Sequence, residues 1–417
     1  MACYLGLAVA GGLVAAALER TRAGAALASV AGAAVTLALW AAGVALTGAP
    51  LRANLATAAL YVAALAASAW RAPGPRGGRR PLLRGVAVST AGVMLMANVA
   101  FFDALRRAAT GAGRGGARLF DWAPPPSRQP GFDLPGLSPE VTPPDAFYRM
   151  SKNVVDPNPD GDAWRLTVGG RQWRLADLLA LPRVDVPCTL RCVSNRVDTH
   201  LMSTALFSGV RLRDLLAAAG VPAAGLDAWV VFVGLDGHAD SIETEAALDP
   251  DTLVAYAMNG HALTRAHGYP ARLLIPGRYG FKNVKWLSEI RVSPEPFAGT
   301  WQQLGWTRTA VMKTMSRIDV ARREGAGAVV AGVAYAGVRG VRAVRVRFDD
   351  GPWRQATLHV PPFGPATWVQ WRIATDGPAR AVVVQAVDGT GAEQPSEERG
   401  QFPDGAQGLH RAVISDP

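Results

Sequence analysis

The pattern of hydrophobic and polar positions changes near residue 105. Before that point, four apolar runs lie at residues 3–19, 24–49, 53–70 and 83–105, and they consist mostly of Ala, Leu, Val and Gly. An apolar run of about 20 residues is long enough to span the hydrocarbon core of a bilayer. The runs have no polar face, so they do not fit the amphipathic helices of a soluble bundle. We therefore predict an all-α bundle of four transmembrane helices over residues 1–105.

Arginines predict the orientation of these spans. The loop at 71–82 carries several arginines, whereas the loop near Pro50 carries only Arg52. The positive-inside rule places the 71–82 loop in the cytoplasm and the chain after the fourth span outside. Arginines that follow this span favour the opposite orientation: Arg106, Arg107, Arg114 and Arg118. The paired Arg79 and Arg80 before an apolar run are typical of a twin-arginine export signal, and equally of a simple cytoplasmic flank.

Beyond the spans, the pattern indicates a linker and then an α+β domain. Residues 106–146 are rich in Pro and Gly and lack periodicity, which is typical of an extended linker. Residues 147–315 contain strand patterns such as WRLTVGG and DAWVVFVGLDG. They alternate with short amphipathic helix patterns such as LADLLAL and VRLRDLLAAAG. Mixed short strands and helices over this length predict an α+β domain with its own core.

Residues 316–417 show a different pattern, in which apolar and polar positions alternate. Examples are VVAGVAYAG, TWVQWRIATD and ARAVVVQAVDG, which are separated by Gly, Pro and Asp turns. Short strands at this spacing predict a C-terminal Ig-like β-sandwich of about 100 residues.

Two of the three cysteines, Cys188 and Cys192, lie four residues apart in the polar stretch CTLRCVSN. This spacing is compatible with a disulfide, with half of a metal site, or with one reactive thiol beside an inert one. Residues four apart on one face of a strand are separated by about 13 Å, which is too far for a disulfide. A soft metal would take a deprotonated cysteine as its ligand.

Several longer motifs follow one another in a specific order. They are FYRMSK at 147–152, TLRCVSN at 189–195 and YAMNGHALTRAHGYPARLLIPGRYGFKNVKWL at 256–287, followed by DDGPW and AVDGTG in the predicted sandwich. Together they resemble the sulfite oxidase family of molybdopterin-dependent oxidoreductases, and most of all its membrane-anchored bacterial members that lack a haem domain. The resemblance implies a sulfite-oxidase-like molybdopterin domain, a molybdenum–molybdopterin cofactor and oxygen-atom transfer.

The resemblance also bears on localisation. It implies a protein of the bacterial cytoplasmic membrane whose catalytic domain is extracytoplasmic. A twin-arginine route would suit such a protein, because a domain that carries a pterin must fold before it is exported. The pattern around Arg79 and Arg80 agrees with this expectation.

Site residues follow from the resemblance, position by position. Cys192, in the element Cys-x-x-Asn with Asn195, is implied as the thiolate ligand of molybdenum. The phosphate and pterin contacts are implied at His267, at Arg272 and in the turn Asn283–Val284–Lys285. A phosphate needs cations and backbone N–H groups, so the residue types in these motifs agree with the assignment. The remaining implied cofactor contacts are Tyr148, Arg149, Ser151, Lys152 and Asp236.

The implied substrate pocket departs from the family pattern at three positions. Met150 and Val197 stand where the family has arginines, and Trp306 stands where it has a catalytic tyrosine. Each lost cation removes a charge-assisted hydrogen bond worth about 1.5–3 kcal/mol. We therefore expect sulfite to fit poorly and a neutral or organic small molecule, such as an S- or N-oxide, to fit better, with Trp306 as the candidate catalytic residue. His200 is either a proton carrier or a surface residue.

Electrons must be exchanged with a separate partner. All six histidines lie beyond residue 199, and no Cys-x-x-Cys-His element is present, so the spans hold no bis-histidine haem and the chain no c-type haem. We expect an electron-transfer protein or a quinone-linked subunit as the partner. The resemblance of the sandwich to the family's dimerisation domain implies a homodimer. The net charge of +10 is spread through loops, so a nucleic-acid partner is not expected.

A second class of function stays open. The same fold could serve as a catalytically drifted, membrane-tethered binding or assembly module. Met150, Val197 and Trp306 favour this alternative, whereas the intact Cys192 and the phosphate motif favour an enzyme. A transporter is poorly supported, because no charged residue lies deep within the spans to mark a substrate path.

Overall fold

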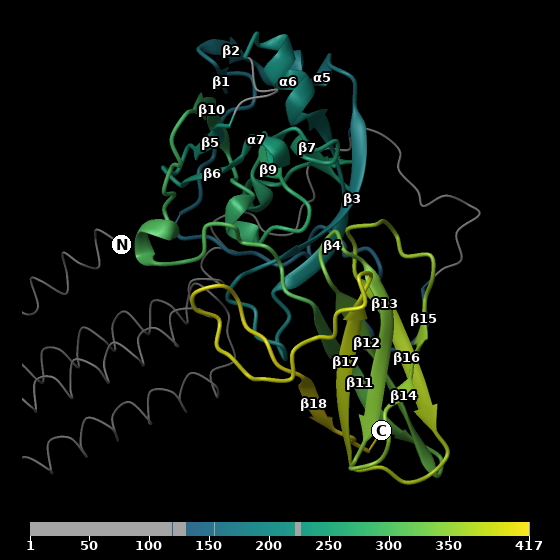
Figure 1. The fold of residues 1–417 in the computed structure, drawn as a ribbon. Coiled ribbons are helices and arrows are strands. Elements are labelled where there is room, and N and C mark those ends of the chain that lie inside the picture. The colour runs from purple at the N-terminus through teal and green to yellow at the C-terminus, as the bar shows by residue number, and fades with distance from the viewer. Residues whose placement is uncertain (1–118, 120–130, 154, 222–226, 417) are drawn as a thin grey trace, which may run out of the picture. The chain divides into compact units, whose positions relative to one another are not determined.

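A computed structural model describes residues 119, 131–153, 155–221 and 227–416. The chain divides into two units, one of Met1–Gly113 with Lys152–Val155 and one of Arg114–Ser151 with Asp156–Pro417. All the helices and strands described below belong to the second unit (Figure 1). The four predicted spans lie outside the described residues. Within the described ranges, no helix is long and apolar enough to cross a membrane.

The first sheet of the second unit has five strands in the order β2-β1-β10-β5-β6. Its strands are β1 Leu166–Val168, β2 Arg171–Trp173, β5 Trp229–Gly234, β6 Ala239–Glu243 and β10 Leu287–Ser293. β1 runs parallel to β10, and the other neighbours are antiparallel. Three short helices pack apolar side chains against it: α5 Leu175–Leu179, α6 Leu212–Ala218 and α7 Thr244–Ala247. The shared core fixes the position of the β5–β6 turn and of the segment that leads into β10.

The second sheet carries the segment with the two cysteines. It is ordered β3-β4-β7-β8, with β9 pairing to β7. Its strands are β3 Val184–Arg191, β4 Met202–Arg211, β7 Leu253–Met258, β8 His261–Ala262 and β9 Arg272–Leu274. Cys188 lies opposite Ala205, and β3 ends one residue before Cys192. The sheet therefore holds one cysteine inside a strand and delivers the other to a loop.

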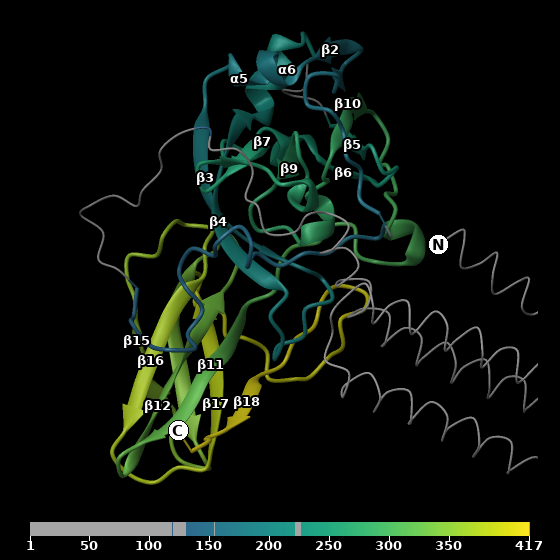
Figure 2. The same cartoon turned by 180° about the vertical axis from the view of Figure 1, so that it is seen from behind.

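The C-terminal strands form a sandwich of two four-stranded sheets. One has the order β11-β12-β16-β15 and the other β14-β13-β17-β18. The strands are β11 Met315–Glu324, β12 Gly327–Tyr335, β13 Val341–Phe348, β14 Arg354–Gln355, β15 Thr357–Leu358, β16 Val369–Thr375, β17 Ala381–Asp388 and β18 His410–Val413. Val330 and Trp371 of one sheet share a core with Val344 and Val384 of the other. Figures 1 and 2 show these strands grouped at one end of the second unit, with α5, α6 and β2 at the other.

The α+β organisation and the β-sandwich predicted from alternation are thus confirmed, while the Ig-like relationship remains a prediction. The helix predicted at 210–220 begins only at Leu212, because Val210 and Arg211 end strand β4 and pair with Val254 and Leu253 of β7. Apolar alternation in β4 continues into the helix without a turn signal, so the boundary is not visible in the pattern.

The described part of the predicted linker, residues 131–146, contains no helix or strand, yet it is tied to the rest of the unit. The Phe132 N–H donates to Gln370 Oε1 at 2.9 Å. Glu140 Oε1 lies 2.9 Å from His359 Nδ1. The Thr142 N–H donates to the backbone carbonyl of β4 at Thr204, 2.8 Å away. These bonds hold the chain just before the FYRMSK motif in a fixed place.

A glycine of β4 offers a test of this packing. A Cβ added at Gly209 would lie 2.3 Å from the Val254 backbone oxygen and 2.6 Å from the Ala255 Cα. Gly209→Ala should therefore force β4 and β7 apart and lower stability by about 1–3 kcal/mol. Thermal unfolding of the full chain should show a lower Tm. Gly377→Ala, where a Cβ would meet nothing within 4 Å, is the control; equal Tm values for the two variants would contradict the described strand contact.

Candidate active site

Cys192 lies at the start of the loop that joins β3 to β4. The Cys192 N–H donates to the Leu201 carbonyl at 2.9 Å, and its own carbonyl accepts from the Asn195 N–H at 3.1 Å. The Asn195 side chain is fully buried, and its Oδ1 accepts from Leu201 N at 2.7 Å and Thr199 Oγ1 at 3.0 Å. In the structure, Asn195 therefore closes the loop around Cys192.

The two cysteines are free thiols in different surroundings. Cys188 is fully buried among apolar side chains, and burial raises the pKa of its thiol to about 12. Cys192 retains 8% exposure, and its Sγ lies 3.2 Å from Ser194 Oγ. Burial raises the pKa of Cys192 as well, but the Ser194 hydroxyl, the Ser194 N–H and the Arg191 charge oppose the rise. The two cysteines form no disulfide, and of the two, Cys192 is the thiol suited to chemistry.

Arg272, on β9, is a buried cation that no carboxylate neutralises in the described part of the chain. It is 5% exposed. Its Nη1 donates to the His267 carbonyl at 3.2 Å and its Nη2 to the Asn283 carbonyl at 3.3 Å. Burial lowers the pKa of this guanidinium to about 10, and ionised Tyr148 or Cys188 would oppose the shift. A buried charge held only by neutral carbonyls is costly, so the site is suited to an anionic ligand.

His267 and Lys285 surround the same place. His267 is 2% exposed, and its Nε2 lies 3.1 Å from the Pro144 carbonyl oxygen. Burial lowers the pKa of the imidazole to about 3, and the charges of Lys285, Arg272 and Arg149 add to the shift. Lys285 Nζ donates to the Met150 carbonyl at 3.0 Å and the Ala266 carbonyl at 2.9 Å. The electrostatic potential at this place is therefore positive, and a bound phosphate would offset the positive charge.

Tyr148 connects this positive cluster with the thiol. Burial raises the pKa of its phenol well above the usual range, and the negative charge of a Cys192 thiolate would raise it further, while Arg272 opposes the rise. A Cβ added at Gly280 would lie 2.7 Å from Tyr148 Oη. Glycine at this position therefore lets the phenol approach the 280–285 turn, and the phenol stays protonated as a hydrogen-bond donor at neutral pH.

The other predicted cofactor residues act mainly through backbone geometry. Asn283 Nδ2 donates to the Arg278 and Tyr279 carbonyls, both at 3.2 Å, and its Oδ1 accepts from Ile275 N at 2.7 Å. Val284 is fully buried between the two α+β sheets. Asp236 lies in the β5–β6 turn, where its Oδ1 accepts from the His238 N–H at 3.0 Å, next to a backbone bond from Leu235 N to Trp286 O.

The structure places only part of the FYRMSK motif with the positive cluster. The Arg149 charge reaches His267. Ser151 Oγ donates to Asp156 Oδ1, so its hydroxyl is used within the segment. Lys152 belongs to the other unit, and its Nζ donates to Asn153 Oδ1 at 3.3 Å. Of this motif, Tyr148 and Arg149 are the residues that the structure places with the positive cluster.

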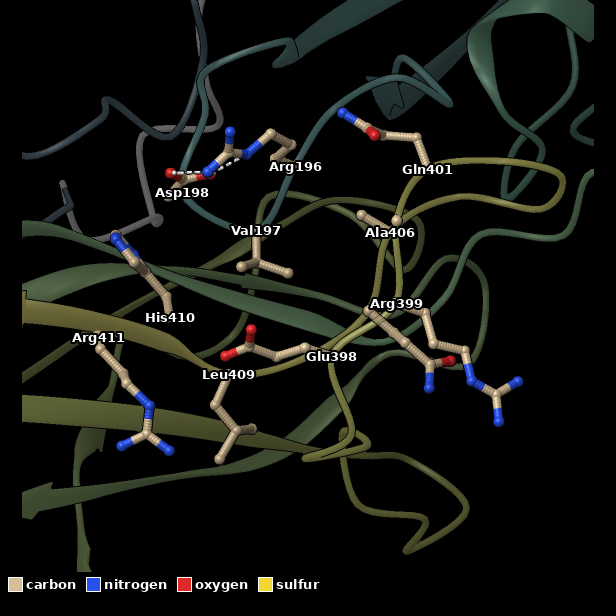
Figure 3. A pocket seen from close by; sticks show the side chains of 12 residues that line it. Arg196, Val197, Asp198, Glu398, Arg399, Gln401, Ala406, Leu409, His410 and Arg411 are labelled. Atoms are coloured by element: carbon tan, nitrogen blue, oxygen red, sulfur yellow. Dashed lines mark hydrogen bonds and ion pairs between the residues drawn. The ribbon is translucent and has the colours of Figure 1, made fainter.

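A cavity of 490 Å³ opens beside the loop that follows Cys192 (Figure 3). One wall is Arg196, Val197 and Asp198, and the other comes from the C-terminal segment 398–411. Arg196 is bound by Asp198 at 3.0 Å, and Arg399 is bound by Glu397 at 2.8 Å. Gln401 Nε2 donates to the Ser194 carbonyl at 3.4 Å, which joins the second wall to the Cys192 loop.

Trp306 lies near this second wall. Its ring makes edge-to-face contacts with Phe402, with ring centroids 5.4 Å apart, and with Trp301, 6.5 Å apart. His200 is exposed and does not line the cavity. The structure thus places Trp306 in an aromatic group beside the C-terminal segment, and it gives His200 no contact with the Cys192 thiol.

Three features of the site were not predicted from the sequence. Lys282, which shares a motif with Lys285, turns away to form a buried ion pair with Asp240 at 2.6 Å. Arg191, directly before Cys192, is fully buried. The cavity segment 398–411 comes from a part of the chain about 200 residues away from Cys192. For Arg191 alone, the sequence carries a signal: a charged residue stands at the end of a mostly apolar strand. The other two features have no such signal.

The residues present fit a phosphate-bearing cofactor next to a thiolate. The buried charge of Arg272 lacks a carboxylate in the described residues, and Gly280 leaves space that a side chain would fill. His267 and Lys285 add donors to the same place. Fold and site together therefore define a class: an α+β domain with a buried, positively charged site for an anionic ligand and a cysteine at the end of a neighbouring strand.

Comparisons with known proteins identify the family. A family model described as "Oxidoreductase molybdopterin binding domain" matches residues 153–301. Chicken (Gallus gallus) sulfite oxidase is 31% identical over 313 residues, which cover 61% of this chain and 68% of the chicken protein. The chain belongs to the sulfite oxidase family of molybdopterin-dependent oxidoreductases, and the family indicates a molybdenum–molybdopterin cofactor.

Other relatives match shorter stretches. Human (Homo sapiens) mitochondrial sulfite oxidase is 37% identical over 191 residues, which cover 39% of this chain and 35% of the human protein. A nitrate reductase [NADH] of Volvox carteri is 39% identical over 144 residues, covering 28% of this chain and 17% of that protein. The chain thus spans about a third of the length of the human relative, so the alignment alone does not transfer that enzyme's whole activity.

A solved structure supports the fold. The sulfane dehydrogenase SoxCD from Paracoccus pantotrophus superimposes with a TM-score of 0.59 at 23% identity, covering 68% of this chain and 82% of that chain. At this identity, the likeness concerns the fold alone.

The unneutralised cation in the site leads to a test. Arg272→Gln removes the charge that would hold the cofactor phosphate, and each lost charged hydrogen bond is worth about 1.5–3 kcal/mol. Retention of the cofactor should therefore fall by about 10- to 100-fold. Pterin fluorescence and molybdenum content per chain measure it on purified full-length protein. Arg291→Gln, an exposed arginine paired with Glu289, is the control; full cofactor in both variants would contradict the assignment.

Proposed function

We propose that this protein is a membrane-anchored oxidoreductase that performs oxygen-atom transfer at a molybdenum ligated by Cys192. The observation that carries the proposal is the position of Tyr148. A Cβ added at Gly280 would lie 2.7 Å from the Tyr148 Oη and 3.4 Å from the carbonyl oxygen of Arg191, which precedes Cys192. The 280–285 turn that begins at Gly280 also holds Arg272 through the Asn283 carbonyl at 3.3 Å. A thiol and an anion site on either side of one tyrosine match the two ends of a phosphate-bearing metal cofactor.

The side chains have separate roles in this proposal. When bound, the molybdenum–molybdopterin cofactor supplies a metal that can exchange an oxygen atom and two electrons with a substrate. Arg272, His267 and Lys285 bind its phosphate and pterin end. Cys192 provides the thiolate, and the Ser194 hydroxyl 3.2 Å away stabilises the charged sulfur. The protonated Tyr148 donates a hydrogen bond into the site.

The substrate class follows from the cavity walls. Val197, Ala406 and Leu409 place apolar groups among polar lining residues. Of the three arginines in the lining, Arg196 and Arg399 are already bound by carboxylates, and Arg411 is the third. A dianion such as sulfite would have to compete with those carboxylates for two of the three arginines. A neutral S- or N-oxide needs only a weaker donor, so it suits this lining better. The aromatic group of Trp306, Trp301 and Phe402 adds an apolar surface and no acidic proton for catalysis.

Partners and location complete the proposal. All six histidines lie beyond residue 199, so the N-terminal runs hold no bis-histidine haem, and in this proposal electrons pass to or from a separate protein or a quinone-linked subunit. The N-terminal runs anchor the chain in the bacterial cytoplasmic membrane, with the catalytic part extracytoplasmic. The C-terminal sandwich, as an Ig-like domain, would carry a homodimer contact where the spans allow it.

The alternative is a membrane-tethered binding or assembly module without catalysis. Met150 favours this alternative. Its side chain is 44% exposed and does not line the cavity, and a methionine supplies no positive charge for a substrate anion. The described residues also contain no cluster of three or more His, Cys, Asp or Glu side chains that could hold a metal. A thiolate-ligated cofactor needs only one such residue, so molybdenum content separates the two functions.

The enzyme proposal predicts about one molybdenum per chain in full-length protein purified from membranes of a host that makes the pterin. Cys192→Ser should lose S- or N-oxide reduction by a reduced viologen dye and change the Mo(V) EPR spectrum, because a metal–sulfur bond is lost. Cys188→Ser makes the same chemical change four residues away and should keep both signals. Protein free of molybdenum, or two variants that behave alike, would favour the binding module. Higher turnover with sulfite than with dimethyl sulfoxide or trimethylamine N-oxide would contradict the substrate class.

The location predicts a dependence on the arginine pair before the fourth span. Replacing Arg79 and Arg80 with lysine keeps the charge but removes the twin-arginine signal. The catalytic part should then stay accessible only from the cytoplasm, as measured by protease protection in spheroplasts. The control replaces Arg71 and Arg76, which lie in the same loop, with lysine. Unchanged external cleavage in the Arg79/Arg80 variant would show that export does not use this pair.

A further inference from the structure

Arg191 is a fully buried arginine at the end of β3, one residue before Cys192. Its Nη1 donates to the Lys313 carbonyl at 3.2 Å. Its Nη2 donates to the carbonyls of Asn195, at 3.3 Å, and Ala406, at 3.4 Å. The three acceptors come from the Cys192 loop, from the chain before β11 and from the cavity segment, so the guanidinium is held in place from three directions.

The charge of Arg191 has no counterion in the described part of the chain. The acceptors of its hydrogen bonds in the described residues are neutral carbonyls, and its Nε is buried with no acceptor there. Its guanidinium carbon lies 5.6 Å from the centre of the Tyr279 ring, which offers weak compensation. Burying a charge in this way costs several kcal/mol in real proteins. Packing alone would be served as well by an apolar side chain, so the charge itself calls for an explanation.

Arg317 gives a direct comparison within the same chain. It is also buried, at 1% exposure, and its Nη1 donates to a carbonyl of the same loop, that of Thr199, at 3.1 Å. Its Nε, however, is paired with Asp319 Oδ1 at 2.6 Å. Both arginines hold the Cys192 loop, but only Arg191 keeps a net positive charge.

We propose that Arg191 is a positioning residue whose fixed positive charge, behind Cys192, tunes the metal centre that this cysteine would ligate. This inference rests on the proposed function. A thiolate-ligated centre becomes more negative when it accepts an electron, and a nearby buried cation stabilises that reduced form. Arg191 therefore raises the reduction potential of the centre, and the three carbonyls keep the charge at a constant distance.

The test is the Mo(VI)/Mo(V) reduction potential of the full-length holoprotein, measured by EPR during a redox titration. R191Q keeps hydrogen-bonding capacity but removes the charge, and it should shift the potential downward. R191K keeps the charge and should stay closer to the parent protein. The double variant R317M/D319N, which removes a neutralised ion pair bound to the same loop without changing the net charge, should lower the Tm with a much smaller change in potential.

Several outcomes would overturn the inference. If R191Q and R191K shift the potential equally, or if R191Q and R317M/D319N do, the residue acts only through packing. Loss of the metal from both R191Q and R191K would also count against the inference, because the variant that keeps the positive charge would then behave like the variant that lacks it. A parent protein without molybdenum would instead refute the proposed function, so the two failures can be told apart.

Discussion

Positive charge that is buried without a carboxylate is the constraint around which the catalytic part of this protein is organised. Arg272 and Arg191 lie on different segments, and each is held by backbone carbonyls alone in the described residues. Carbonyl dipoles offset only part of the cost of removing a cation from water. The fold supplies the remainder through its large apolar cores, and it leaves a field that attracts an anion. The carbonyls that hold the two cations belong to different segments of the chain: Lys313, Asn195 and Ala406 for Arg191, and His267 and Asn283 for Arg272.

Neighbouring lysines show how selectively this field is built. Lys282 and Lys285 are three residues apart, yet Lys282 is neutralised by Asp240 and a second bond to the Ser241 carbonyl. Lys285 faces the other way, towards Met150 and Ala266. The 280–285 turn thus separates a lysine in a buried ion pair from a lysine bound to backbone carbonyls near His267. Local sequence cannot make this distinction, because it depends on which distant strand supplies an acid.

Strand alternation predicted the sandwich and most strands of the α+β part, because burial on one face imposes a period of two that is visible in the sequence. The start of α6 was predicted two residues too early. An apolar Val210 followed by a polar Arg211 fits the alternation of a strand as well as the pattern of an amphipathic helix. Strand geometry correctly excluded a disulfide between Cys188 and Cys192. The importance of Arg191 and of the cavity segment depends on contacts across more than a hundred residues, which no local pattern encodes.

Strand β3 has a consequence for how such a protein can change during evolution. Its middle is joined to the sandwich, since Thr189 accepts from Tyr335 Oη at 3.0 Å and from Trp368 N at 2.9 Å, while its end presents Cys192. The sandwich is therefore part of the support of the strand that leads to Cys192, and it is not structurally independent of that strand. Recombination between relatives would have to transfer β3 together with the sandwich, so the two segments are expected to be inherited as one piece.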